Sequence, residues 1–186
     1  MNNIDTTPNH VEVHELSFEP LLSPQQVQDA VWRIGQDISM QFKGKNPLFI
    51  AVLNGAFIFA ADLIRSVSFD NEIAFVKVAS YQALQSTGNI SELIGLDKDV
   101  EGRSVIVIED IVDTGHTISY LSKLLKDRGA SEIAFAVLLL KEEAYQYDIH
   151  LDFVGFRIPN RFVIGYGLDY NHYGRGLRGI YVLKES

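Results

Sequence analysis

Three carboxylates and a turn of small residues lie close together near the middle of the chain. Glu109 and Asp110 follow the β-branched run 105–108, and Asp113 opens the Asp-Thr-Gly-His-Thr turn at 113–117. Apolar residues then recur at helical spacing, at Ile118, Leu121, Leu124 and Leu125. Because the first N–H groups of a helix have no partner within it and the helix dipole favours negative charge there, this turn predicts a phosphate site. The two acids beside it are expected to face the hydroxyl groups or the metal ion of a phosphorylated sugar.

Other residues able to do chemistry follow predicted strands elsewhere in the chain. Asn54 follows the apolar run 48–53, and Lys141 follows the run 133–140. Ligands of open parallel sheets bind beyond the carboxyl ends of the strands. We therefore expect Asn54, Glu109 and Lys141, each at the end of its own strand, to converge on one crevice.

The elements that must position these residues alternate between strand and helix. Ser23 and Pro24 are typical of a helix start, with Ser as the N-cap and Pro in the first turn. We expect helices at about 24–43, 56–65 and 117–128, and strands at 48–53, 73–78, 90–96, 105–108, 133–140, 153–155, 162–166 and 180–183. Residues 1–15 are polar and expected to fray, and 80–89 have the composition of a loop. The alternation predicts an α/β domain with a parallel central sheet.

The bulk composition is that of a soluble globular protein. The 186 residues suit a single domain spanning residues 1–186, with 47% hydrophobic and 22% charged residues. Sixteen basic and twenty-four acidic residues give a net charge of −8 without a basic block, which argues against a nucleic-acid partner. The chain has no Cys, which excludes disulfides and thiol catalysis and fits a reducing cytoplasm. The polar start and the lack of any run of transmembrane length argue against a signal peptide and a membrane partner, so we expect a cytoplasmic protein.

The run from Val105 to Thr117 resembles the signature of the type I phosphoribosyltransferases, which use 5-phosphoribosyl-1-pyrophosphate, and within them the hypoxanthine-guanine branch. Further matches extend from about Leu48 to Tyr181. The resemblance implies a central, mostly parallel sheet flanked by helices, with a small hood and a mobile flap. It also implies an enzyme that transfers the phosphoribosyl group to N9 of hypoxanthine or guanine, giving IMP or GMP and pyrophosphate, with Mg²⁺ as cofactor. Relatives are commonly dimers or tetramers, so a homodimer or homotetramer is expected.

The resemblance further implies a role for each matching residue around the sugar phosphate. The 5′-phosphate is bound by Asp113, Thr114, Gly115, His116 and Thr117. Asp113 also lies near N7 of the purine, where a carboxylate can take or hold a proton of the incoming base. Glu109 and Asp110 face the ribose hydroxyls and, together with Asp169, the magnesium ion.

The purine and the pyrophosphate have their own implied contacts. The purine is held by Lys141 at the 6-oxygen, Phe162 by stacking, Val163 through its backbone, and Asp169. The pyrophosphate is held by Leu53, Asn54, Gly55 and Arg175. In the family a cis peptide commonly precedes the middle residue of this loop, so the Leu53–Asn54 bond is expected to be cis or strained. Ser80 and Tyr81 match the start of the flap, which shields the reaction from water.

Two positions depart from the family pattern. Asn54 and His116 stand where many relatives carry a basic residue. At position 54 the departure leaves the backbone contacts possible but removes a cation from the pyrophosphate loop. His116 is expected to face solvent and not to act as a base.

Three other functions are compatible with parts of this pattern. A phosphoribosyltransferase for xanthine, adenine or a pyrimidine shares the signature, although Lys141, Phe162 and Asp169 favour 6-oxopurines without deciding xanthine. A sugar-phosphate-sensing regulator would keep the fold, but such proteins usually add a DNA-binding domain or a basic face, and only about twenty residues precede the first predicted helix. A phospho-acceptor or phosphatase domain needs a nucleophilic Asp at a strand end, a role to which the turn at 113–115 is less suited.

Overall fold

The computed structural model describes residues 8–80 and 90–185 of the chain. In this part, six strands form a central sheet in the order β5-β4-β3-β6-β7-β8. Their bounds are β3 Leu48–Leu53, β4 Glu72–Ser80, β5 Ile90–Ile94, β6 Ser104–Val112, β7 Glu132–Leu140 and β8 Phe153–Arg157. Neighbouring strands pair in parallel, except that β5 pairs antiparallel with β4. The predicted α/β architecture with a mostly parallel sheet is confirmed.

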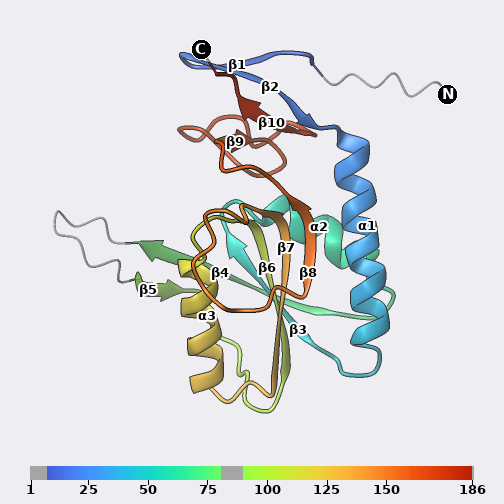
Figure 1. The fold of residues 1–186 in the computed structure, drawn as a ribbon. Helices are drawn as coiled ribbons and strands as arrows, with labels where there is room; N and C mark the ends of the chain where they lie inside the picture. Colours follow the sequence, from blue (N-terminus) through green and yellow to red (C-terminus); the bar gives the residue numbers. More distant parts are fainter. Residues whose placement is uncertain (1–7, 81–89, 186) are drawn as a thin grey trace.

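Helices cover both faces of this sheet (Figure 1). In the described residues they are α1 Pro24–Gln41, α2 Phe57–Ser66 and α3 His116–Asp127. Buried side chains of β6 alternate between the two faces: Ile106 and Ile108 pack with α1 and α2, whereas Val105 and Val107 pack with α3. The strand is therefore buried on both sides, as its continuous β-branched run predicts.

The start of α1 is fixed by its own sequence. The Gln26 backbone N–H donates to Ser23 Oγ at 3.2 Å, and the Ser23 backbone N–H donates to Gln26 Oε1 at 2.8 Å. This reciprocal pair satisfies two backbone donors that the helix cannot, and Pro24 follows in the first turn. The predicted helix start is confirmed, and the helix ends at Gln41, just before the predicted stop.

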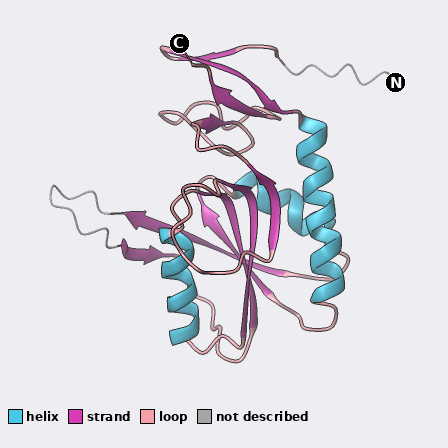
Figure 2. Ribbon diagram, viewed as in Figure 1, coloured by secondary structure: helices cyan, strands magenta, loops and turns pink. Residues whose placement is uncertain are grey.

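A second sheet, the hood, lies above the central sheet (Figure 2). Its order is β1-β2-β10-β9, with bounds β1 Val11–Val13, β2 Leu16–Leu22, β10 Ile180–Leu183 and β9 Val163–Ile164. The prediction that residues 1–15 fray is wrong for the part that the structure describes, because residues 11–13 form β1 and Val13 is buried. The cause is tertiary: β2 pairs with β10 from the far end of the chain, and Phe18 packs with Tyr181 in the hood core.

The central strand β6 is longer than predicted. It continues past Ile108 to Val112, because its parallel pairing with β7 continues to the partners Val112 and Leu140. Glu109 and Asp110 are therefore residues of the strand itself and do not follow its end, which corrects the predicted boundary. A buried, paired strand thus carries two acids toward the hood.

Some expectations lie at or outside the limits of the described part. Tyr81 and the rest of the predicted loop, up to residue 89, are outside it, and Ser80 is the last residue of β4. Among the helices that the structure describes, none combines the length and the apolar character that crossing a bilayer requires.

Candidate active site

A cavity of about 370 Å³ opens between the ends of the central strands and the hood. It is lined by Asn54, Gly55, Asp110, Ile111, Asp113, Lys141, Phe162, Val163, Leu168, Asp169 and Arg175. These residues come from the ends of β3, β6 and β7 and from the hood segment 162–175. Most of the residues singled out in the sequence for base and pyrophosphate contacts therefore share one cavity.

A smaller cavity of about 120 Å³ surrounds the turn before α3. Its lining is Glu109, Ile111, Val112, Asp113, Thr114, Gly115, His116, Thr117 and Ile118. The two cavities share Ile111 and Asp113, so they adjoin. Gly115 is the N-cap of α3 with φ of +88° and has no side-chain cap. No capping side chain therefore satisfies the first N–H groups of the helix, and an anion in this cavity could do so.

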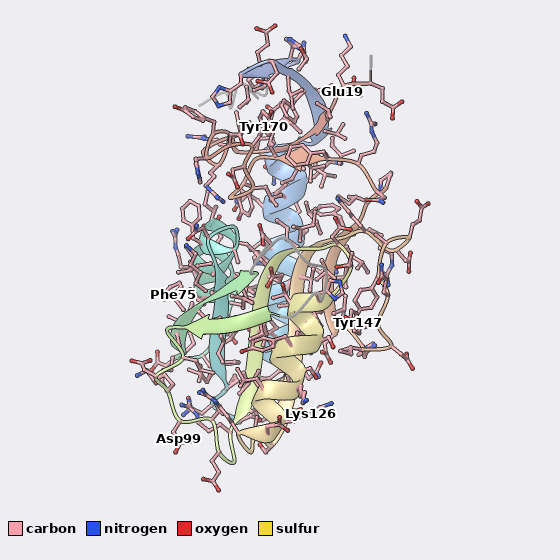
Figure 3. All side chains as sticks on the ribbon, turned by 90° about the vertical axis from the view of Figure 1, so that its left-hand side faces the viewer. Glu19, Phe75, Asp99, Lys126, Tyr147 and Tyr170 are labelled. Atoms are coloured by element: carbon pink, nitrogen blue, oxygen red, sulfur yellow. The ribbon has the colours of Figure 1, made fainter. Side chains whose placement is uncertain are left out.

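The segment after β7 braces this turn from outside. A Cβ on Gly115 would lie 2.4 Å from Tyr145 Cε2, and the Gln146 backbone N–H donates to the Thr114 carbonyl at 3.1 Å. The Tyr147 hydroxyl and His116 Nδ1 are 2.6 Å apart, and Figure 3 shows Tyr147 beside the upper part of α3. His116 is exposed, as predicted. The only local signal of this brace in the sequence is a pair of tyrosines in a polar segment, which does not predict such a contact.

Lys141 and Asp113 form an ion pair across the larger cavity. The Lys141 ammonium donates to Asp113 Oδ2 at 2.9 Å, and the Lys141 side chain is 10% exposed against 50% for Asp113. The Lys141 backbone N–H also donates to the Val112 carbonyl at 2.9 Å, which fixes the strand end. Lys141 was expected where the strand opens to solvent, and the structure instead places its side chain inside. A buried donor and a half-exposed carboxylate thus lie within reach of one ligand.

The two acids of β6 are buried, and their environments raise their pKa values. Burial, with a contribution from the nearby Asp110 charge, raises the pKa of Glu109 well above its usual range. Glu109 Oε2 has no hydrogen-bond partner among the described residues. Burial also raises the pKa of Asp110 to about 6, opposed by backbone N–H groups and Arg175 and assisted by the Asp169 charge. Two buried carboxylates, one of which has an oxygen without a partner in the described part, fit a site that receives hydroxyl donors or a metal.

The hood contributes a second ion pair to the larger cavity. Arg175 Nη2 lies 2.7 Å from Asp169 Oδ1, and Arg175 Nη1 donates to the Gly167 carbonyl at 2.5 Å. Asp169 Oδ2 accepts the His172 backbone N–H at 2.7 Å. One cation and one acid are therefore held in fixed orientation opposite Asp110.

The loop after β3 forms the other wall. The Leu53–Asn54 peptide bond is cis, as predicted. A Cβ on Gly55 would lie 1.7 Å from Asp110 Oδ2, so only glycine allows the loop to approach this acid. Asn54 lines the cavity, whereas Leu53 is outside both linings.

Phe162 is a wall of the cavity and not a core residue. Its side chain is 41% exposed. Its ring lies 6.2 Å from that of Phe18 and 5.9 Å from that of Tyr170, centroid to centroid, so two hood aromatics support it. An exposed ring held in this way offers a flat face to a planar ligand.

The acids fit a magnesium ion that is shared with a substrate. No cluster of three or more metal-binding side chains occurs in the described residues. Asp110 and Asp169 line the larger cavity, and Glu109 lines the smaller one. Mg²⁺ commonly keeps several waters and takes only one or two protein carboxylates together with substrate phosphates, so two acids in one cavity suffice.

Comparison with known proteins gives consistent matches. Residues 18–171 match the model of the phosphoribosyl transferase domain. The hypoxanthine-guanine phosphoribosyltransferase of Bacillus subtilis is 42% identical over 167 residues, which are 89% of this chain and 93% of that protein. The bifunctional protein TilS/HprT of Listeria monocytogenes is 41% identical over the same share of this chain, which spans only 26% of its length. A crystal structure of a hypoxanthine-guanine phosphoribosyltransferase from Bacillus anthracis superposes with a TM-score of 0.82 at 35% identity, covering 89% of this chain and 98% of that one.

Proposed function

This chain belongs to the phosphoribosyl transferase family, and we propose that it joins hypoxanthine or guanine to 5-phosphoribosyl-1-pyrophosphate. The products are IMP or GMP and pyrophosphate. The observation that carries this proposal is the Lys141–Asp113 pair at 2.9 Å, in the same cavity as the exposed face of Phe162. Its chemistry suits a flat base with an acceptor oxygen at one position and a ring nitrogen that gives up a proton at another.

The sugar phosphate is proposed to lie across both cavities. Its 5′-phosphate would occupy the turn at 113–117, where the N–H groups of α3 and two threonine hydroxyls are available. The ribose hydroxyls would donate to Glu109, whose Oε2 has no hydrogen-bond partner among the described residues, and to Asp110, which lines the larger cavity. The pyrophosphate would lie between the Asn54–Gly55 backbone and Arg175.

In the proposed reaction, N9 of the base attacks C1′ of the ribose as the bond from C1′ to the pyrophosphate oxygen breaks. Asp113 takes the proton that the base carries at N7, and its charge offsets positive charge on the ribose in the transition state. Lys141 donates to the 6-oxygen, Phe162 stacks on the ring, and Val163 binds it through its backbone. Ser80 and Tyr81 are proposed to begin the flap that keeps water away from the reacting carbon.

Magnesium is the proposed cofactor. Asp110 and Asp169 would hold it, with Glu109 beside the ribose, and when bound it would neutralise the charge of the pyrophosphate leaving group.

One assay tests the proposal. The purified protein, 5-phosphoribosyl-1-pyrophosphate and Mg²⁺ are incubated separately with hypoxanthine, guanine, xanthine, adenine and uracil, and nucleotide formation is followed. We expect turnover with hypoxanthine or guanine and almost none with adenine or uracil. A preference for xanthine or adenine would replace the proposed substrate, and no turnover with any base would favour a binding function.

A further inference from the structure

A buried tyrosine joins the hood to two helices behind the pyrophosphate end of the site. The Tyr166 hydroxyl donates to Asp62 Oδ2 on α2 at 2.6 Å. Gln28 on α1 donates through Nε2 to the same oxygen at 3.1 Å and to the Tyr166 hydroxyl at 3.4 Å. Burial and the Asp62 carboxylate both raise the pKa of Tyr166, so its hydroxyl keeps its proton and acts as a donor.

The Tyr166 side chain is directed away from the proposed active site. It lines a separate cavity of about 360 Å³ together with Gln28, Asp62 and Arg178, among others. Its neighbour Leu168 lines the active-site cavity instead. Tyr166 has φ of +50°, a left-handed conformation that aromatic residues rarely adopt, so the fold holds this residue in an unfavourable backbone conformation. The backbone around Tyr166 is therefore the wall between the two cavities.

The backbone next to Tyr166 contacts Arg175 and Gly55, which are proposed to face the pyrophosphate. Gly167 accepts the Arg175 guanidinium on its carbonyl at 2.5 Å and donates its N–H to the Arg175 carbonyl at 3.0 Å. A Cβ on Gly167 would lie 2.1 Å from the Gly55 carbonyl oxygen, so the hood backbone touches the loop after β3. A shift of Tyr166 would consequently move Arg175 relative to Gly55.

Asp62 is tied to the opposite wall. It lies on α2, which begins at Phe57 as a direct continuation of the Asn54–Gly55 loop. The Phe57 backbone N–H donates to the Asn54 carbonyl at 3.4 Å, which couples the loop to the first turn of the helix. The bond between Tyr166 and Asp62 therefore connects the hood wall to the helix that carries the loop wall.

We infer that Tyr166 and Asp62 are a positioning pair that sets the gap between the Asn54–Gly55 loop and the Asp169–Arg175 pair. The inference rests on the proposed function, in which this gap holds the pyrophosphate of the substrate. Neither residue lines the active-site cavity, so both act through the groups that do. The base contacts at Lys141 and Phe162 are held by β7 and by hood aromatics, and they lie outside this link.

The test removes the hydroxyl alone. For Tyr166→Phe we expect KM for 5-phosphoribosyl-1-pyrophosphate and Kd for Mg²⁺-pyrophosphate to rise about three- to tenfold. This rise corresponds to part of the free energy that a hydrogen bond to a charged group contributes. KM for hypoxanthine and kcat should stay within about twofold, because the base contacts do not depend on the link. Asp62→Ala should reproduce this pattern, and the double variant should add little to either single change. Asp62→Asn, whose amide oxygen can still accept the tyrosine proton, should retain most of the affinity.

Ser66→Ala is the matched control. Ser66 ends α2, and its hydroxyl donates to the Leu63 carbonyl at 2.7 Å, so this variant loses a hydrogen bond of the same helix without touching the link. Unchanged pyrophosphate affinity in Tyr166→Phe, or equal losses for both substrates, would overturn the positioning role. If wild type binds pyrophosphate but transfers to no base, the proposed function fails while the Kd comparison still decides the inference. If wild type does not bind pyrophosphate, both are wrong.

Discussion

The acid at the meeting point of the two cavities is Asp113, which the structure pairs with Lys141. For Asp113→Asn we expect kcat to fall about 10²–10⁴-fold, because an amide cannot accept the proton of the base. The backbone N–H groups of the turn are unchanged, so Kd for ribose 5-phosphate should stay close to that of wild type. Steady-state assays measure kcat, and calorimetry measures Kd for ribose 5-phosphate. Unchanged turnover would remove Asp113 from the mechanism.

The partner of this acid, Lys141, is expected to choose the base. Its ammonium has three donors and no acceptor, so it suits the 6-oxygen of hypoxanthine and opposes the amino group of adenine. With adenine, the Lys141 ammonium would face another hydrogen-bond donor in a partly desolvated site, which costs about 1.5–3 kcal/mol. This cost corresponds to a preference of roughly ten- to hundredfold for hypoxanthine over adenine. Lys141→Gln, whose amide both donates and accepts, should lower the ratio of kcat/KM for hypoxanthine over adenine. A ratio that does not fall would mean that another residue selects the base.

The acid on β6 that faces the larger cavity gives a pH-dependent prediction. The pKa of Asp110 is raised to about 6 in the folded protein from 3.8, so this group contributes stability below about pH 4 that is lost as pH rises through 6. The Asp110→Asn variant has no carboxylate at this position, so it does not lose this stability as pH rises. In EDTA at pH 7.5, Asp110→Asn should raise the free energy of unfolding by about 1–3 kcal/mol, with a smaller gain at pH 4.

Urea unfolding of wild type and Asp110→Asn across pH 4–8 measures this difference. Asp152→Asn is the control, because that partly buried acid also accepts a backbone N–H, that of Phe135, but lies outside both cavities. A gain that is the same at pH 4 and at pH 7.5 would show that the charge of Asp110 is not the cause.

Residue types in a local pattern predicted which side chains line the site, but not how they pair. The turn, the acids and Lys141 stand next to strands whose ends must converge, so their convergence followed from topology alone. The Lys141–Asp113 pair and the Tyr166–Asp62 bond join residues far apart in the chain. No local periodicity encodes such a contact, and Tyr166 in particular has the composition of an ordinary core aromatic.

At the scale of elements, prediction succeeded where one element carries its own signal. α1 has a capping box and an apolar face, and β3 and β7 are continuous apolar runs. β1 was missed because three residues are too few for a pattern and its partners supply its stability. The end of β6 was placed too early because two acids resemble a strand end, whereas pairing with β7 keeps them in the strand.

The turn between β6 and α3 offers a prediction about an element boundary. Gly115 has φ of +88°, and a Cβ there would also meet Tyr145 at 2.4 Å. Gly115→Ala should therefore weaken binding of IMP about tenfold or more, since a left-handed residue costs about 1–2 kcal/mol and the clash displaces the turn. Gly44→Ala is the matched control, because Gly44 has φ of +78° with open space around it and lies far from the site in the chain. Equal losses of IMP affinity in both variants would contradict the role of the turn.

At the scale of the whole molecule, the hood and the central sheet share one core. Val163, Ile180 and Val182 of the hood pack into the cluster under α1 and α2, while Ile164 and Tyr181 face the hood's own core. The candidate site lies at this junction, with the turn at 113–117 on the central sheet and the Asp169–Arg175 pair on the hood. A ligand that reaches from one to the other binds only when both are folded.

Thermal unfolding should therefore report the complete site. We expect a single cooperative transition, because the two sheets share buried side chains. Saturating 5-phosphoribosyl-1-pyrophosphate with Mg²⁺, at about 100 times Kd, should add about 2.7 kcal/mol and raise Tm by roughly 5–10 °C. Mg²⁺ alone should give almost no shift, since two carboxylates of the cavity bind it weakly without the substrate's oxygens.

The variant that tests the metal site is Asp169→Asn, which keeps the side-chain size and an oxygen for the His172 N–H but removes one of the three acids of the larger cavity. It should lose most of the extra Tm shift that Mg²⁺ adds to the substrate. Because the variant also loses the ion pair with Arg175, the Mg²⁺ increment is compared within each protein. Calorimetry with substrate in Mg²⁺ and in EDTA gives both shifts for each protein. Two separate transitions would show that the hood unfolds independently. If Mg²⁺ adds the same extra Tm shift in wild type and in the variant, the metal does not bind at Asp169, because a ligand stabilises the folded chain only through the groups that bind it.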